Sequence, residues 1–174
     1  MSVKTIITEP NKILRHISKP IKKVGKHEQS LMDDMLDTMY AADGIGLAAI
    51  QIGIPKRIIV MDIDHKEEGK NPMYFVNPEI ISKSKNNSTY EEGCLSVPGQ
   101  FAEIDRPDKC VIKYLNYHGE SKTIETTGML STCIQHEIDH LNGILFIDYL
   151  SKLKKSMIIK KLSKQKKAVE RIIV

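Results

Sequence analysis

The chain has 174 residues, of which 41% are hydrophobic and 28% charged, and its formal net charge is +4. This size and composition suit one compact domain covering residues 1–174, and no apolar run approaches the roughly 18 residues that a membrane span needs. The first residues contain neither the apolar stretch nor the cleavage site of a secretory leader, and three scattered cysteines do not suit a disulfide framework, so we expect a cytoplasmic protein that binds neither membrane nor DNA.

The first predicted elements are an irregular segment over 5–20, interrupted by Pro10 and Pro20, and a helix over 28–42. One face of that helix is apolar and the other carries three aspartates, which is the pattern of a helix packed on a core. The apolar face consists of Leu31, Met32, Met35, Leu36 and Met39. We expect the methionines in the core rather than at a cofactor, because this flexible side chain commonly fills gaps in cores.

Residues 43–53, DGIGLAAIQIG, end this helix and are mostly small and apolar. Gly44 and Gly46 flank Ile45, and two glycines allow unusual torsions and the close approach of another chain or a substrate. A helix cap followed by a turn explains the same residues more simply, and for this segment alone we favour it. Gln51 is the only strongly polar residue in the second half of the segment, so its amide needs a partner if it is buried.

The middle of the chain predicts short strands separated by turns, because branched and aromatic residues alternate with Asn, Gly and charged residues. We expect an exposed hairpin loop over 62–71, which contains His65, and turns at 86–87 and 118–119. The expected strands are 57–63, 73–76, 79–82, 101–104, 109–115 and 121–125. With helices early and late in the chain, they predict an α+β fold with largely antiparallel sheets.

Cys94 lies in a stretch that contains glycine and proline, residues 91–99, EEGCLSVPG. Gly93 lets the chain turn just before the cysteine, and Pro98 lacks a backbone donor just after it, so we expect Cys94 on a shaped loop or at a strand end. A free cysteine is most often a small core residue, and nothing in this stretch by itself makes it a ligand.

The strongest pattern is HEIDH at residues 136–140. In a helix, His136 and His140 stand one turn apart on one face, the spacing at which two imidazoles can hold one metal ion. Glu137 can take a proton from a metal-activated water, which distinguishes this pattern from a chance pair of histidines. An apolar stripe on the other side predicts that both faces are buried and that the sheets pack around this helix. The stripe consists of Leu130, Ile134, Ile138 and Leu141.

A catalytic metal site needs a third protein ligand. Cys133 lies on the histidine face but is seven residues from His140, about 10 Å of helix rise, so we expect it to line the pocket instead. The downstream ligand of zinc peptidases is missing, because only Asp148 and Glu170 are acidic after His140. Cys94 is therefore the best remaining ligand.

Residues 151–174 contain nine lysines or arginines against one acid, a net charge of +8 that leaves −4 for the rest of the chain. Apolar residues recur beside the lysines from Leu150 to Val169, which predicts a basic C-terminal helix. Such a helix is either a solvated helix docked on the body or one directed at an anionic partner.

Three segments together resemble the signature motifs of the peptide deformylase family, in the same order and with similar separations. They are GIGLAAIQ at 44–51, EGCLS at 92–96, and HEIDH followed by LNG at 136–143. The resemblance covers most of the chain, including the early helix and the basic C-terminal helix. It implies that a metal-bound water removes the N-formyl group from the formyl-methionine of nascent chains and releases formate. It also implies a ferrous ion, which Zn²⁺, Ni²⁺ or Co²⁺ can replace.

The resemblance further implies roles for the residues that match the motifs. The implied metal ligands are Cys94, His136 and His140, with water as the fourth ligand. Glu137 would act as general base and then as general acid, and the amide of Gln51 and the backbone N–H of Leu95 would stabilise the oxyanion. Asp139 is expected to pair with Arg106 beside the ligands.

The nascent peptide is expected to lie as an added strand against Ile45, between Gly44 and Gly46. The residues expected around the methionine side chain are Ile45, Glu92, Cys133 and His136, with Gly93 as a further substrate contact. The C-terminal helix is expected to bind ribosomal RNA or protein near the exit of the peptide tunnel. Two other functions remain open: a metallopeptidase that cuts internal bonds, and a non-catalytic metal-binding or ribosome-associated protein.

Overall fold

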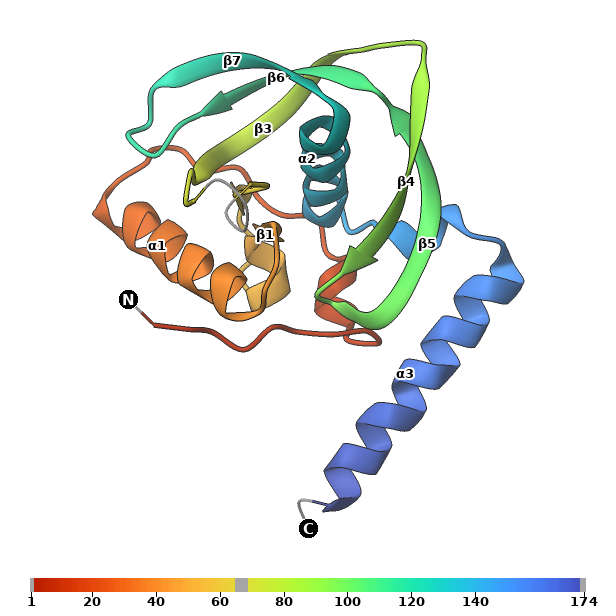
Figure 1. Cartoon of the computed structure of the whole chain (residues 1–174). Helices are drawn as coiled ribbons and strands as arrows, with labels where there is room; N and C mark the ends of the chain where they lie inside the picture. The colour runs from red at the N-terminus through yellow and green to blue at the C-terminus, as the bar shows by residue number, and fades with distance from the viewer. Residues whose placement is uncertain (1, 65–68, 173–174) are drawn as a thin grey trace.

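The computed structural model describes residues 2–64 and 69–172, and its strands form two antiparallel sheets (Figure 1). Five strands pair in the order β1-β2-β3-β6-β7, and β4 pairs with β5 alone. The expected α+β fold with antiparallel sheets is confirmed. The strands are β1 (Gly46–Ala48), β2 (Ile58–Met61), β3 (Met73–Lys83), β4 (Asn87–Cys94), β5 (Val97–Pro107), β6 (Lys109–Leu115) and β7 (Ser121–Thr127). The helices are α1 (Lys26–Ala41), α2 (Gly128–Leu141) and α3 (Lys152–Ile172), with 3-10 turns η1 (Lys12–Arg15), η2 (Ala49–Ile52) and η3 (Phe146–Tyr149).

The central element is α2, which lies between the large sheet and the β4–β5 hairpin (Figure 1). Ile134, Ile138 and Leu141 are buried in one cluster with strand residues of the large sheet. Burying an aliphatic side chain of this size contributes about 1.5–3 kcal/mol to stability. The opposite face, which carries His136 and Glu137, is also buried. The predicted burial of both faces is confirmed.

The helix α1 packs against β1 and β2 of the large sheet, and the prediction that its methionines lie in the core is confirmed. The helix begins at Lys26, two residues before the expected start, because the Glu28 carboxylate accepts a hydrogen bond from the Gly25 N–H at 3.2 Å and caps the first turn. A second core cluster forms between this helix, β1 and β2. The fully buried methionines of α1 are Met32, Met35 and Met39.

β3 is one strand, so the prediction of two strands at 73–76 and 79–82 is wrong. The Asn77-Pro78 pair typically favours a turn, and Asn77 has a left-handed φ of 50°. The strand continues because β3 pairs with β2 before this point and with β6 beyond it, across a shift in register. The Asn77 amide holds the bulge by bonding both the N–H and the C=O of Ile21 at 2.8 Å.

β4 begins at Asn87, inside the turn predicted at 86–87, and runs to Cys94 through residues for which no strand was predicted. Its sequence NSTYEEGC has little apolar character, because one side of the hairpin is exposed and the strand is held by backbone pairing with β5. The two strands are consecutive and turn back on each other between Cys94 and Val97, but the polar sequence of β4 shows no strand pattern. Cys94 does lie at a strand end, as expected, where the register shifts after Gly93. β5 is correspondingly longer than the predicted strand at 101–104.

Residues 46–52 also differ from the favoured prediction of a helix cap and turn. They form β1, which pairs with β2 at the edge of the large sheet, and the 3-10 turn η2. The predicted hairpin loop over 62–71 does connect β2 to β3. Its central residues 65–68, which include His65, lie outside the described part of the chain.

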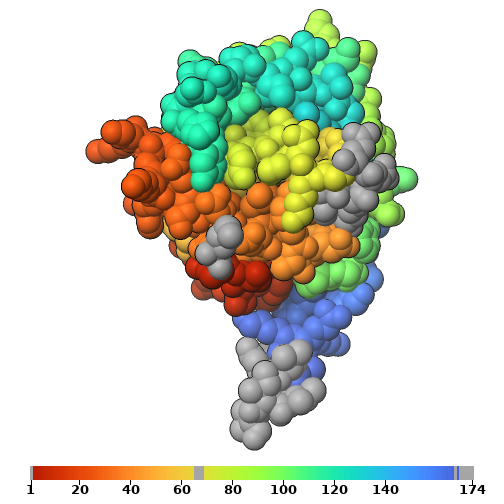
Figure 2. All heavy atoms as spheres, turned by 60° about the vertical axis from the view of Figure 1, so that its left-hand side comes forward, coloured from red at the N-terminus to blue at the C-terminus, as the bar shows by residue number. Residues whose placement is uncertain are grey.

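The predicted basic C-terminal helix is present as α3, and it projects from the rest of the described chain (Figure 1; Figure 2). Only part of its apolar stripe packs on the body. Leu162 is buried and Ile158 is partly buried in a cluster with residues of β5 and η3, whereas Leu153 and Met157 are exposed. None of the helices in the described residues is long and apolar enough to cross a bilayer.

Candidate active site

Three potential metal ligands meet where the end of β4 faces the second half of α2. Cys94, His136 and His140 each offer one ligand atom, and these atoms all lie within 4.8 Å of one another. The sulfur of Cys94 is 3.2 Å from Nε2 of His140. Thiolate and imidazole are typical donors of metal sites with three protein ligands and one open position. The structure therefore brings together the three residues that the sequence predicts as ligands.

Both histidines present Nε2 to this site. Nδ1 of His136 lies 2.8 Å from Oε2 of Glu92. When the ring proton is on Nδ1 and shared with Glu92, Nε2 keeps a free lone pair that can bind a metal. In His140, Nε2 faces the Cys94 sulfur, and Nδ1 has no hydrogen-bond partner among the described residues. One sulfur and two nitrogen donors fit a divalent metal ion of borderline softness.

Glu92 connects His136 to a buried network of ion pairs. Arg106 is 3% exposed, and its Nη2 donates to Oε2 of Glu92 at 3.0 Å while its Nη1 donates to Oδ2 of Asp139 at 2.8 Å. The structure thus contains the pairing of Asp139 with Arg106 that the sequence predicts. A carboxylate on the far ring nitrogen fixes the tautomer and orientation of a ligating histidine, so this network positions His136.

Gln51 is 1% exposed, and both ends of its amide are bonded. Its Oε1 accepts from the Ala48 N–H at 2.8 Å, and its Nε2 donates to Oγ of Ser96 at 3.1 Å. The same Nε2 lies 3.7 Å from the sulfur of Cys94. These bonds hold the NH₂ group of Gln51 beside the potential ligands, and Leu95 lines the same cavity one residue after Cys94.

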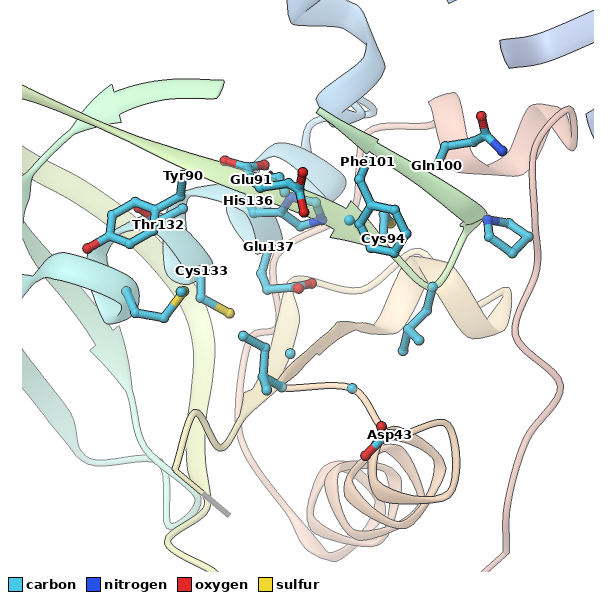
Figure 3. A pocket seen from close by; sticks show the side chains of 18 of the residues that line it. Asp43, Tyr90, Glu91, Cys94, Gln100, Phe101, Thr132, Cys133, His136 and Glu137 are labelled. Atoms are coloured by element: carbon cyan, nitrogen blue, oxygen red, sulfur yellow. Dashed lines mark hydrogen bonds and ion pairs between the residues drawn. The ribbon is translucent and has the colours of Figure 1, made fainter. Parts of the chain in front are cut away.

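Glu137 points its carboxylate into the cavity (Figure 3), and its Oε2 has no hydrogen-bond partner among the described residues. Gly46 of β1 leaves the space for this carboxylate. A Cβ at position 46 would lie 2.6 Å from Oε1 of Glu137 and 3.0 Å from the sulfur of Cys133. Any side chain there would displace Glu137. The sequence suggested that Gly46 allows the close approach of another group. In the structure that group is the protein's own Glu137 carboxylate.

The cavity has a volume of about 580 Å³ and opens between β1, the β4–β5 hairpin and α2 (Figure 3). Most of the residues predicted for the site line it. These are Gly44, Ile45, Gly46, Gln51, Glu92, Gly93, Cys94, Leu95, Cys133, His136 and Glu137. His140, Arg106 and Asp139 do not line it, and His140 and Arg106 are buried behind it.

The family model for polypeptide deformylase matches residues 3–156 of the chain. The chain belongs to the peptide deformylase family. The resemblance carried by the three motifs is thereby confirmed, and with it the class of enzyme, a hydrolase of a metal-dependent family. Most of α3 lies beyond the matched residues.

Known deformylases match nearly the whole chain, both in sequence and in solved structures. The peptide deformylase of Pelagibacter ubique is 68% identical over 174 residues and covers 100% of both chains. That of Phenylobacterium zucineum is 53% identical over 97% of this chain and 99% of its own. The crystal structure of the Ehrlichia chaffeensis enzyme in complex with actinonin has a TM-score of 0.91 and 44% identity, with 95% of this chain and 98% of that chain covered.

Burial and neighbouring charges together set the protonation of this deformylase site. Burial raises the pKa of Glu137 to about 7, although the nearby charge of His136 acts against the shift. Burial also holds the pKa of His140 well below its ordinary value, which keeps the ring neutral, the form that binds a metal. For His136 burial acts in the same direction, but Cys94 and Glu92 outweigh it and raise the pKa above its ordinary value.

Cys133 lines the deformylase cavity beside Glu137, as predicted, and does not belong to the ligand group. Burial raises the pKa of its thiol well above the usual range, so the thiol stays protonated. A cysteine that binds a metal does so as the thiolate. Cys133 therefore lines the cavity as a neutral thiol, whereas Cys94 would have to be a thiolate to bind a metal.

Nine of the residues that line the cavity are absent from the predicted site, and four of them show which signals the sequence offered. Met129 and Thr132 precede His136 by seven and four residues, so helical spacing places them on its face and could have identified them. Tyr90 and Phe101 lie on β4 and β5, and their positions follow from the pairing of Phe101 with Gly93. Both strands belong to one hairpin, but the polar sequence of β4 shows no strand pattern from which this register could be read.

Proposed function

We propose that this deformylase removes the N-formyl group from the formyl-methionine that begins nascent polypeptides. Water adds to the formyl carbon, the C–N bond breaks, and the products are formate and a free amine. The position of Glu137 is the observation that carries this proposal. A buried carboxylate with an unpartnered oxygen lies in one cavity with two of the potential metal ligands, His136 and Cys94.

We propose Fe²⁺ as the cofactor, with Zn²⁺, Ni²⁺ or Co²⁺ as substitutes. The sulfur of Cys94 and Nε2 of His136 and His140 would hold it. When bound, the metal supplies a Lewis acid that lowers the pKa of water toward neutrality and polarises a carbonyl. With three protein donors, such a site would keep a further position for water or substrate.

The side chains of the cavity perform the proton transfers and stabilise charge. Glu137 accepts the proton of the attacking water and passes it to the departing amine. Nε2 of Gln51 and the backbone N–H of Leu95 donate to the formyl oxygen as negative charge develops on it. The bonds of Gln51 to Ala48 and Ser96 hold its donor in place before the substrate arrives, which is the preorganisation that such a site needs.

We propose that the nascent peptide adds as a strand at the edge formed by β1. Among the described strands, β1 pairs only with β2, so its other edge is free of strand pairing. Gly44, Ile45 and Gly46, at and just before the start of this strand, line the cavity. Backbone hydrogen bonds along the edge would hold peptides of any sequence. The methionine side chain would enter the part of the cavity lined by Ile45, Glu92, Gly93, Cys133 and His136.

Formate release tests the activity. Anaerobically purified, metal-loaded protein is expected to release formate from formyl-Met-Ala-Ser and to cleave acetyl-Met-Ala-Ser about 10- to 200-fold more slowly, because the added methyl group must fit a closed site. An enzyme-coupled assay measures formate, and mass spectrometry identifies other products. Cleavage of internal peptide bonds without formate release would establish the alternative, a metallopeptidase.

We further propose that residues 1–174 form one catalytic domain that works on the ribosome in the cytoplasm, with α3 as the contact to ribosomal RNA or protein near the tunnel exit. This helix carries exposed lysines from Lys152 to Lys166 and projects from the body (Figure 1). Positive charge on such a surface favours binding to phosphate groups. The exposed lysines are Lys152, Lys154, Lys160, Lys161, Lys164 and Lys166.

Charge reversal on α3 is expected to lower the ribosome-bound fraction about tenfold or more, because each lost phosphate contact weakens binding. The variant replaces Lys160, Lys161, Lys164 and Lys166 by Glu and is compared with wild type by co-sedimentation. Hydrolysis of free formyl-Met-Ala-Ser should not change. A matched control reverses four exposed lysines of the body, Lys22, Lys23, Lys83 and Lys85. An equal loss in both variants, or none in the first, would contradict the role of α3.

A further inference from the structure

We infer that Tyr149, at the end of η3, is a positioning residue that holds the metal ligand His136 in place through Asp139, Arg106 and Glu92. The inference rests on the proposed metal site and adds an outer residue to it. Tyr149 is 51% exposed and does not line the cavity. Its effect on the reaction can therefore be exerted only through the residues it contacts.

The outer half of the connection consists of two contacts of Tyr149. Its hydroxyl donates to Oδ2 of Asp139 at 2.8 Å, and that same oxygen accepts from Nη1 of Arg106 at 2.8 Å. The guanidinium carbon of Arg106 also lies 4.9 Å from the centre of the tyrosine ring. Tyr149 thus covers the guanidinium with its ring and anchors the carboxylate that pairs with it.

The inner half runs from Arg106 to the metal ligand. Nη2 of Arg106 donates to Oε2 of Glu92 at 3.0 Å, and that oxygen lies 2.8 Å from Nδ1 of His136. Glu92 and Arg106 are both nearly inaccessible to solvent, so losing either one would leave the other with a buried charge and one partner fewer. A shift of the guanidinium would move the carboxylate that orients the His136 ring.

Two further observations support a positioning role for η3. Burial and the bond to Asp139 raise the pKa of Tyr149 to about 12, so its hydroxyl remains a proton donor throughout the neutral range. Phe146, from the same 3-10 turn, stacks on the His136 ring with centroids 6.3 Å apart and an interplanar angle of 24°. One short turn therefore restrains His136 directly through Phe146 and indirectly through Tyr149.

The test uses Co²⁺-loaded protein, because the visible spectrum of Co²⁺ reports ligand geometry independently of activity. Tyr149→Leu is expected to transfer its metal to a chelator about tenfold faster than wild type and to shift the Co²⁺ bands, since outer partners of ligating histidines typically contribute 10- to 100-fold. Tyr149→Phe keeps the ring over Arg106 but loses the bond to Asp139, so its rate of metal release should lie between those of wild type and Tyr149→Leu. The unfolding midpoint should change little, because the side chain is half exposed.

Tyr117→Phe is the matched control. Its hydroxyl also bonds an aspartate, Asp33, at 3.1 Å, but it lies outside this network. The inference would be overturned if Tyr149→Leu released its metal at the wild-type rate with a wild-type Co²⁺ spectrum. It would also be overturned if Tyr117→Phe changed the release rate and spectrum equally. Neither result would affect the proposed function. A separate variant, His136→Ala, must lose the metal. If it retained the metal with a wild-type spectrum, the proposed site and this inference would both fall.

Discussion

Replacing Glu137 by Gln is expected to lower the rate of formate release from formyl-Met-Ala-Ser by about 10²- to 10⁴-fold, the usual contribution of a general acid–base group. The amide has the size of the carboxylate, so it fits the space that Gly46 and Cys133 leave for it. It cannot accept a proton from water. The loss should therefore appear in kcat with the metal still bound, which is checked by measuring metal content beside the initial rates.

Glu91→Gln is the control for this variant. Glu91 lines the same cavity two residues before Gly93, but its side chain is exposed at the surface. The same chemical change there should leave the rate within about twofold of wild type, as for most exposed substitutions. A Glu137→Gln protein that keeps its metal and more than about a tenth of the activity would show that another group moves the proton.

Replacing Arg106 by Met is expected to lower the free energy of unfolding by about 3–5 kcal/mol, because it leaves buried charge without a partner. Arg106 contacts the carboxylates of Glu92 and Asp139, and both Arg106 and Glu92 are almost fully buried. Urea unfolding followed by circular dichroism gives the change. This loss should far exceed that of Lys122→Met, which removes an exposed pair with Glu120 and should have no measurable effect.

The double variant Arg106→Met, Glu92→Met separates burial of charge from loss of packing. Because a buried ion pair can often be replaced by apolar groups without loss, the double variant should regain most of the stability lost by Arg106→Met. Its activity should stay low, since His136 has then lost the carboxylate on Nδ1. A double variant as unstable as the single one would show that Arg106 stabilises the protein by packing rather than by charge.

Patterns within one element could be read from the sequence alone. The spacing of His136 and His140 and the apolar stripe behind them depend only on helix geometry, so they predicted an amphipathic helix buried on both faces. The methionine face of α1 was predictable for the same reason. Family membership was also predictable, because three short motifs in one order are more specific than any one of them.

Contacts between elements were decided by the tertiary structure. Cys94 could be proposed as third ligand only by elimination and by resemblance, and it reaches the histidines because β4 pairs with β5 and lies against α2. β4 was not predicted because its sequence is mostly polar. β3 was predicted as two strands because Asn77-Pro78 is typical of a turn. β3 pairs with β2 and with β6, which lie elsewhere in the chain, so a local window around Asn77 does not show that the strand continues.

The sequence by itself determined the helix that carries His136, Glu137 and His140, because helical spacing is a local property of the backbone. Only the tertiary structure decided that Gly46 makes room for Glu137, and that Tyr149 reaches His136 through three intervening side chains. Both results depend on the close packing of segments from different parts of the chain. Side chains in such a core fit to within a few tenths of an ångström, and that fit exists only after folding.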